Sequence, residues 1–248
     1  MNLNSLKGKR ILVIGATSGI GEKTAYMLAE QGCHLILVGR NKKKLQELKK
    51  NLDEDTVTIE YDLHDLDNIE HIFLTSKDNS IKLDGMIYSA GIAKNSIVRA
   101  NDWRDLEEVL QINCMAFVEV AKYFAMKKYC NDGASIVAIS SIASLLNDAG
   151  MVQYSASKSA LNSAVKTMAK EFVKRKIRVN GILPANVNTD MFLSGKEYIE
   201  NFMETALERQ PLGIIEMEQV GYLSEFLISD CSKYITGELI TMGGGMSY

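Results

Sequence analysis

The stretch RILVIGATSGIG, residues 10–21, joins a short apolar run to three glycines in the spacing GxxxGxG. Residues 10–15 read as a strand buried on both faces of a parallel sheet. Gly15, Gly19 and Gly21 then permit a sharp turn and a close approach of the backbone to a diphosphate, which the N-terminus of a following helix would stabilise. Thr17, Ser18 and Ile20 lie between these glycines. The stretch predicts a dinucleotide site, and the alternative is that the glycines serve only a tight turn.

The same alternation of short apolar runs and longer helical patterns continues along the chain. It predicts an α/β fold with a doubly wound parallel sheet of about seven strands, flanked by helices on both faces, in one domain over residues 1–248. The expected strands are 10–15, 34–39, 56–60, 84–89, 134–140, 177–183 and 238–242. The expected helices are 20–31, 41–51, 65–78, 102–128, 153–175 and 217–228.

Two segments need separate comment. The helix at 102–128 carries an apolar stripe with a period of 3.6 residues, formed by Leu106, Val109, Leu110, Cys114, Phe117, Val120, Ala121 and Phe124. Residues 186–216 break the alternation with polar, helix-like pieces. This segment is either a lid over a substrate site or an ordinary long insertion.

Composition excludes several classes of function. The 248 residues are 46% hydrophobic and 24% charged, with a net charge of -3, so no basic field favours nucleic acid. The four cysteines are scattered, which argues against a metal site and for reduced thiols. There is neither a signal-peptide pattern nor an apolar run long enough to span a membrane. We therefore expect a cytoplasmic protein without a bound metal.

The end of the second strand bears on the choice of dinucleotide. An NAD site usually places an acidic residue there to bind the ribose 2′-hydroxyl. This chain has Gly39 at that position, followed by Arg40 and Asn41. A guanidinium pairs well with a 2′-phosphate, so NADP(H) is favoured over NAD(H). The alternative is that Arg40 belongs to a solvated face, as we expect for the lysines at 42–44.

Asp62 and Leu63 follow the third expected strand. The carboxylate of Asp62 suits an adenine amino group, with the backbone of Leu63 beside it. Asp is also a preferred N-cap residue, so Asp62 equally suits the start of the next helix. The residues alone leave both roles open.

A second constellation lies after the fifth strand. Ser141 stands at its carboxyl end, where ligands bind in open α/β sheets. Tyr154 follows thirteen residues later, and Lys158 lies one helical turn beyond it on the same face. Taken alone, the pair would be an ordinary surface pair.

In this order and spacing, the motifs resemble those of the short-chain dehydrogenases/reductases, and the resemblance covers essentially the whole chain. It implies that Tyr154 is the proton donor or base, and that Lys158 binds the nicotinamide ribose and lowers the pKa of Tyr154. Ser141 would orient the substrate oxygen, and Asn113 would hold a water linked to Lys158. It further implies cofactor contacts at Ala90, Gly91, Pro184, Val187 and Thr189, and a homo-oligomer, either a dimer or a homotetramer.

The chain departs from the family pattern at four positions. Tyr88 and Ser89 replace two asparagines before Ala90, Ala185 replaces a glycine, and Met242 replaces a common aspartate. None of these changes removes Asn113, Ser141, Tyr154 or Lys158. We expect Tyr88 to alter local packing rather than catalysis.

The resemblance implies an oxidoreductase that interconverts a carbonyl and a secondary alcohol. One candidate substrate is a 3-oxoacyl group on acyl carrier protein, an acidic partner that needs a basic surface. Another is a sugar or polyol derivative, and a third possibility is a non-enzymatic NADP-binding scaffold. Candidate basic residues for a carrier are Lys127, Lys128, Lys174, Arg175 and Lys176, although these equally suit solvated helix ends.

Overall fold

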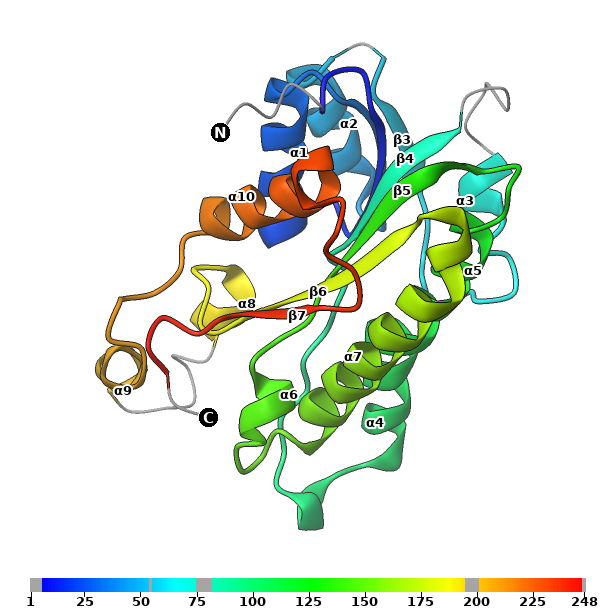
Figure 1. Cartoon of the computed structure of the whole chain (residues 1–248). Coiled ribbons are helices and arrows are strands. Elements are labelled where there is room, and N and C mark those ends of the chain that lie inside the picture. Colours follow the sequence, from blue (N-terminus) through cyan, green and yellow to red (C-terminus); the bar gives the residue numbers. More distant parts are fainter. Residues whose placement is uncertain (1–5, 54, 75–81, 195–200, 247–248) are drawn as a thin grey trace.

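Seven parallel strands form one sheet in the computed structural model, which describes residues 6–53, 55–74, 82–194 and 201–246. The strand order is β3-β2-β1-β4-β5-β6-β7 (Figure 1). The doubly wound sheet expected from the sequence is confirmed. The strands are β1 Arg10–Ile14, β2 His34–Gly39, β3 Val57–Glu60, β4 Leu83–Tyr88, β5 Cys130–Ile139, β6 Arg178–Pro184 and β7 Leu239–Met242.

Helices cover both faces of the sheet (Figure 1). On one face lie α1 Gly19–Glu30, α2 Lys42–Asn51 and α10 Met217–Ile228. On the other lie α4 Trp103–Leu110, α5 Ala116–Phe124 and α7 Val152–Phe172. Each face has its own hydrophobic core, because the apolar strands present side chains alternately to both sides.

Shorter helices lie between these elements: α3 His71–Leu74, α6 Ala143–Leu146, α8 Asp190–Leu193 and α9 Phe202–Arg209. Single 3₁₀ turns occur at Val98–Ala100, Val173–Arg175 and Asp230–Ser232. Figure 1 shows α6, α8 and α9 grouped beyond the same end of the sheet, where β5 and β6 finish.

The order of the strands in the sheet indicates where a cofactor would bind. From β1 the chain adds β2 and β3 in one direction, then returns to place β4 on the other side of β1. The loops after β1 and β4 therefore diverge, and ligands of such sheets bind in the crevice between them. Gly15 and Ala90 meet there, because a Cβ on Gly15 would lie 2.6 Å from the Ala90 nitrogen.

Two of the expected helices differ from the structure. The helix expected at 65–78 is wrong over its first half, where residues 65–70 form turns. Asp65 accepts hydrogen bonds from the backbone and side chain of Asn68, and these local bonds compete with a helix. The helix begins only at His71, and residues 75–78 lie outside the described part.

The expected helix 102–128 ends at Phe124 and contains a π-helical turn, Gln111–Met115. This turn inserts one extra residue and shifts the buried face. Ile112 and Asn113 are buried there, whereas Cys114 of the expected stripe is only partly buried. The rest of the stripe after the turn packs on the sheet as expected.

Candidate active site

The glycine loop after β1 is tightly constrained by its surroundings. Gly15 has φ +82°, and a Cβ on Gly21 would lie 2.2 Å from the Gly15 carbonyl oxygen. Only glycine allows both the turn and this contact, so α1 begins directly over the end of β1. Ser18 is the N-cap of α1 and is exposed, while Thr17 and Ile20 are partly buried beside it. The loop has the shape that a diphosphate needs.

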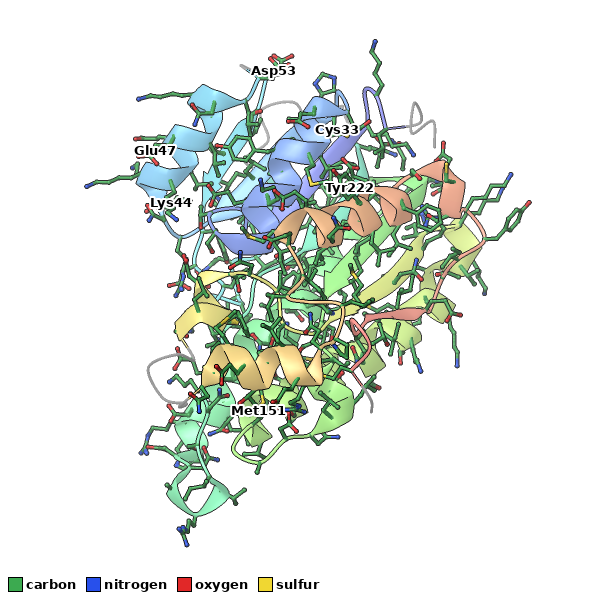
Figure 2. The ribbon with its side chains drawn as sticks, turned by 90° about the vertical axis from the view of Figure 1, so that its left-hand side faces the viewer. Cys33, Lys44, Glu47, Asp53, Met151 and Tyr222 are labelled. Carbon is green, nitrogen blue, oxygen red and sulfur yellow. The ribbon has the colours of Figure 1, made fainter. Side chains whose placement is uncertain are left out.

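The end of β2 explains why no acidic residue stands there. A Cβ on Gly39 would lie 2.5 Å from Cγ2 of Thr17, which is closer than packed atoms approach. Arg40 follows as an exposed side chain that lines the adjoining pocket. Asn41 caps α2, because its Oδ1 accepts the Lys44 N–H at 3.1 Å. Figure 2 shows Lys44 and Glu47 projecting from α2 into solvent.

Asp62 is not a helix cap, because turns follow it and α3 begins only at His71. Its Oδ1 instead accepts the backbone N–H of His64 at 3.1 Å and lies 2.7 Å from the imidazole Nδ1. Burial acts to raise the pKa of Asp62, but these hydrogen bonds and the nearby Arg40 guanidinium outweigh it and hold the pKa below its usual value. Asp62 therefore faces the pocket as a carboxylate, beside Leu63.

One continuous pocket joins these pieces between the carboxyl ends of β1, β2, β3 and β4. It is lined by Ile14, Gly15, Thr17, Ser18, Val38, Gly39, Arg40, Tyr61, Asp62, Leu63, Ser89, Ala90, Gly91, Ile92 and Ile112. Eight residues expected to bind cofactor are thus brought together. Asn41 lies beside this lining rather than in it, and Gly19, Ile20 and Gly21 belong to the adjoining turn of α1.

The segment after β6 approaches the pocket from the other side. The carbonyl of Pro184 accepts the Ile142 N–H at 3.0 Å, and Val187 pairs with Ile215 in a β-bridge. Thr189 caps α8 through Oγ1. A Cβ on Gly19 would lie 3.6 Å from Thr189 Cγ2, so this segment reaches the glycine loop. Thr189 therefore lies beside the glycine loop, whereas Pro184, Val187 and Thr189 are not among the residues that line the pocket.

Asn113 connects two elements of the site through its side-chain amide. Its Oδ1 accepts the Ile92 N–H at 2.8 Å, and its Nδ2 donates to the Ile92 carbonyl at 2.9 Å and to Ser157 Oγ at 2.9 Å. Ser157 in turn donates to the Tyr154 carbonyl at 2.8 Å. Asn113 thus ties the loop after β4 to the first turns of α7. Sequence reasoning missed Ser157, and no spacing motif marks it.

Lys158 is buried, and its Nζ donates to the Ile139 carbonyl at 2.9 Å. The same Nζ lies 5.6 Å from the centre of the Tyr154 ring. Burial lowers the pKa of Lys158 to about 8, because the low-dielectric surroundings disfavour the ammonium form.

Tyr154 and Ser141 lie near one another at the carboxyl end of β5, close enough for the Ser141 hydroxyl to act on the pKa of the Tyr154 phenol. Burial raises the pKa of the Tyr154 phenol, and the neighbouring Ser141 hydroxyl only partly opposes this. In the protein without cofactor the pKa of Tyr154 is thus raised, and the expected lowering by Lys158 stays a prediction for the protein with its cofactor. The physical reason is that desolvation of the phenolate dominates, while the Lys158 ammonium is bonded to a backbone carbonyl.

Two further polar side chains connect elements around the site, and neither was predicted from the sequence. His64 bridges Asp62 to Glu108 of α4, with 3.6 Å between Nε2 and Oε1. Gln210 is fully buried after α9. Its Oε1 accepts the Asn186 N–H at 2.9 Å, and its Nε2 donates to the carbonyls of Asn186 at 3.2 Å and Gly213 at 2.7 Å. It thereby joins the segment after β6 to the end of α9.

The end of α9 also contacts the loop before α7. Arg209 pairs with Asp148 at 2.9 Å. Within the described ranges, no cluster of three or more His, Cys, Asp or Glu residues is arranged to hold a metal ion. Across the same ranges, no helix is both long and apolar enough to cross a membrane.

Comparisons with known proteins agree with this architecture. Residues 15–247 match the family described as "Enoyl-(Acyl carrier protein) reductase". The chain is 30% identical to a 3-oxoacyl-[acyl-carrier-protein] reductase FabG of Thermotoga maritima, covering 97% of this chain and 98% of that protein. It is 33% identical to the short-chain dehydrogenase/reductase aba4 of Botryotinia fuckeliana, covering 99% of each.

A solved structure of a putative gluconate dehydrogenase from Agrobacterium tumefaciens superposes with a TM-score of 0.89. It covers 99% of this chain and 98% of the other, at 24% identity, and thus supports the fold. The family match and the relatives cover nearly the whole chain, as the motifs do. The chain therefore belongs to the short-chain dehydrogenase/reductase family of oxidoreductases.

Proposed function

We propose that this oxidoreductase uses NADP(H) to interconvert a carbonyl and a secondary alcohol, with Tyr154 as the general acid or base. The position of Tyr154 beside Ser141 at the carboxyl end of β5 carries the proposal, because the Ser141 hydroxyl is close enough to act on the pKa of the Tyr154 phenol. Support for a place of these two hydroxyl groups near the pocket comes from Lys158, one helical turn after Tyr154, because a Cβ on the lining residue Gly91 would be 3.4 Å from Lys158 Nζ. A substrate oxygen held by both would sit beside the nicotinamide end of a dinucleotide bound in that pocket.

The residues present fit a dinucleotide. The close contacts of Gly15 and Gly21 leave the backbone of the loop open to a diphosphate. Asp62 suits the adenine amino group, and Arg40 suits a 2′-phosphate. The contact between Gly39 and Thr17 leaves no room for an acidic side chain at position 39, which supports NADP(H) over NAD(H). When bound, the cofactor supplies or accepts the hydride.

In the reducing direction, Ser141 donates a hydrogen bond to the carbonyl oxygen, and Tyr154 transfers its phenolic proton to that oxygen. The raised pKa of Tyr154 keeps this proton in place at neutral pH, as a general acid requires. Below about pH 8 the Lys158 ammonium provides the positive charge that stabilises the resulting phenolate. In the oxidising direction Tyr154 must lose its proton first, so the same burial opposes that direction.

Two substrate classes remain candidates. The name of the Thermotoga relative favours a 3-oxoacyl group on acyl carrier protein. The basic residues considered for a carrier lie at the amino ends of β5 and β6, however, opposite to the edge that holds Tyr154. Arg175 pairs there with Asp132 at 2.7 Å, and Lys128 with Glu70 at 2.7 Å. That cluster therefore offers no support for a carrier, and a sugar or polyol derivative stays the other candidate substrate.

Three broader expectations complete the proposal. We propose that residues 186–216 act as a lid, of which 195–200 lie outside the described part, because Arg209 of this segment pairs with Asp148 in the loop before α7. The exposed apolar side chains of Trp103, Met115 and Val152 support a homo-oligomer, a dimer or tetramer, through α4, α5 and α7. The free cysteines support a cytoplasmic location.

The test is NADPH oxidation against a panel of acyl thioesters, sugars and polyols. We expect turnover with at least one class, and Tyr154→Phe should abolish it while NADPH binding stays nearly unchanged. Tyr234→Phe, at an exposed tyrosine, is the matched control. Substantial turnover by Tyr154→Phe would contradict the proton-donor role. Binding of NADPH without turnover of any compound would favour a non-enzymatic scaffold.

A further inference from the structure

Tyr88 lies at the end of β4, where the family pattern has an asparagine, and its side chain is fully buried. Its hydroxyl donates to the backbone carbonyl of Ile112 at 2.5 Å. Its ring packs edge-on against Phe117, with 5.3 Å between ring centres. A phenol in this position is thus held by one hydrogen bond and one aromatic contact. The hydrogen bond reaches the π-helical turn that contains Asn113.

The π-helical turn leaves the Ile112 carbonyl in need of a partner. The Ala116 N–H donates to the Gln111 carbonyl, five residues back. In a regular α-helix the same N–H would donate to Ile112, four residues back. The turn therefore takes from Ile112 its ordinary helical donor, and an unmet buried carbonyl is costly. The Tyr88 hydroxyl supplies the missing donor from outside the helix.

The π-helical turn also sets the position of Asn113. Without the extra residue, the buried face of α4 and α5 would rotate, and Asn113 would not face Ile92 and Ser157 as it does. The space available is narrow: a Cβ on Gly91 would lie 3.3 Å from Asn113 Oδ1 and 3.4 Å from Lys158 Nζ. Asn113 Oδ1 and Lys158 Nζ therefore both lie against Gly91, on the same side of the loop after β4.

We propose that Tyr88 is a positioning residue for the active site, which acts by stabilising the π-helical turn and through it Asn113. This changes the sequence expectation, which gave Tyr88 a role in packing alone. The kinetic part of the proposal rests on the proposed function, since it concerns the same Asn113, Tyr154 and Lys158. The structural part, that the hydroxyl holds the turn, does not depend on it.

The decisive variant is Tyr88→Phe, which removes the hydroxyl and keeps the ring against Phe117. We expect kcat to fall about fivefold, as for the loss of one ordinary hydrogen bond, with a smaller change in KM for NADPH. We also expect faster hydrogen exchange of the backbone amides in residues 111–117, with and without NADPH.

Two control variants separate the hydroxyl from general stability. Tyr129→Phe also removes one phenolic hydrogen bond, to Glu70 at 2.7 Å, but at the opposite end of the sheet. Phe117→Leu removes the aromatic partner and keeps the Tyr88 hydroxyl. We expect both to keep wild-type kcat, and Tyr129→Phe to keep wild-type exchange in residues 111–117, even where the melting temperature falls.

The possible outcomes are distinct. Unchanged exchange in Tyr88→Phe would overturn the inference, whatever the activity. Faster exchange with wild-type kcat would also overturn it, because Tyr88 would then be only structural. If the wild-type protein turns over no carbonyl, or if Tyr154→Phe remains active, the proposed function fails, and the exchange measurement still decides whether Tyr88 holds the turn.

Discussion

The side chain of Thr17 occupies the space beside Gly39 in which any larger residue at position 39 would begin. This contact between the glycine loop and the end of β2 links the shape of the diphosphate site to the choice of dinucleotide. It leaves Arg40 as the first side chain after β2 that reaches the pocket.

Arg40→Ala should weaken NADPH binding about 10- to 100-fold, the effect of losing a charge-assisted contact with the 2′-phosphate. NADH binding should change less than about twofold, because it has no such phosphate. Titration of both cofactors by fluorescence measures this. Lys44→Ala, on the exposed face of α2, is the control and should change neither affinity. Equal losses for NADPH and NADH in Arg40→Ala would remove the argument for NADP(H).

The close approach of Thr17 to Gly39 leads to a second prediction about cofactor binding. Gly39→Asp alone should bind neither cofactor well, because its Cβ collides with Thr17. Adding Thr17→Ala removes Cγ2 and Oγ1, and leaves a contact of 3.3 Å with the Cβ of residue 17. The double variant should gain NADH binding relative to Gly39→Asp. If Thr17→Ala brings no such gain, the collision is not what excludes an acidic residue.

The lowered pKa of Lys158 predicts a pH dependence. Its ammonium is present below about pH 8 and is lost as the pH rises through that value. Since kcat/KM reports on the free enzyme, kcat/KM for NADPH should fall as the pH rises through about 8. Lys158→Arg keeps a positive charge at every pH tested. The residual kcat/KM of this variant should therefore no longer fall as the pH rises through about 8, that is, its pH profile should lose the basic limb. A limb that persists unchanged in Lys158→Arg would assign it to another group.

Gln210→Leu tests the connection between the segment after β6 and the end of α9. The variant keeps the side-chain size but leaves the Asn186 N–H and two carbonyls without their partner. We expect a stability loss of about 1–3 kcal/mol. KM for NADPH should rise several-fold, because the expected cofactor residues Val187 and Thr189 follow Asn186, which Gln210 holds in place. Asn188→Ala, which removes an exposed bond to Glu216, is the control. Wild-type KM in Gln210→Leu would show that the connection does not matter for binding.

The burial of Glu225 leads us to expect that the stability of the folded protein depends on pH. Glu225 is buried on α10, with Oε1 lacking a hydrogen-bond partner, and burial, together with the charge of Glu30, raises its pKa. The folded protein then holds a proton that the unfolded chain releases, so this residue costs stability as the pH rises above the ordinary carboxyl pKa. Glu225→Gln should therefore melt at a higher temperature than the wild type near neutral pH, and the gain should disappear in acid. A gain of equal size at every pH would contradict this account.

The sequence predicted the sheet well, because strands buried on both faces are continuously apolar and are separated by glycine-marked turns. It failed at residues 65–70, where Asp65 bonds the local backbone, and this competition is invisible to hydrophobic periodicity. It also missed the π-helical turn at 111–115, since one inserted residue merely shifts the phase of an apolar stripe.

For the site, the order and spacing of the sequence motifs predicted which residues come together, but not their hydrogen-bond partners or the direction of their pKa shifts. The direction of the Tyr154 pKa depends on burial, which no motif encodes. The partners of Asp62 and Asn113 depend on His64 and Ser157, ordinary residues whose role comes only from the fold. Most of the assigned residues are thus readable from the sequence, whereas the bonds that orient them require the three-dimensional structure.

The placement of the site at one edge of the sheet has a practical consequence for redesign. Gly15, Ser141 and the segment after Pro184 all follow the carboxyl ends of strands, while both hydrophobic cores lie along the strands themselves. The loops at 92–101 and 186–216 are therefore suitable units for exchange with those of relatives that accept other substrates. Such chimaeras would retain the folding determinants of this chain, provided that the exchanged segment keeps Gln210 and its backbone partners.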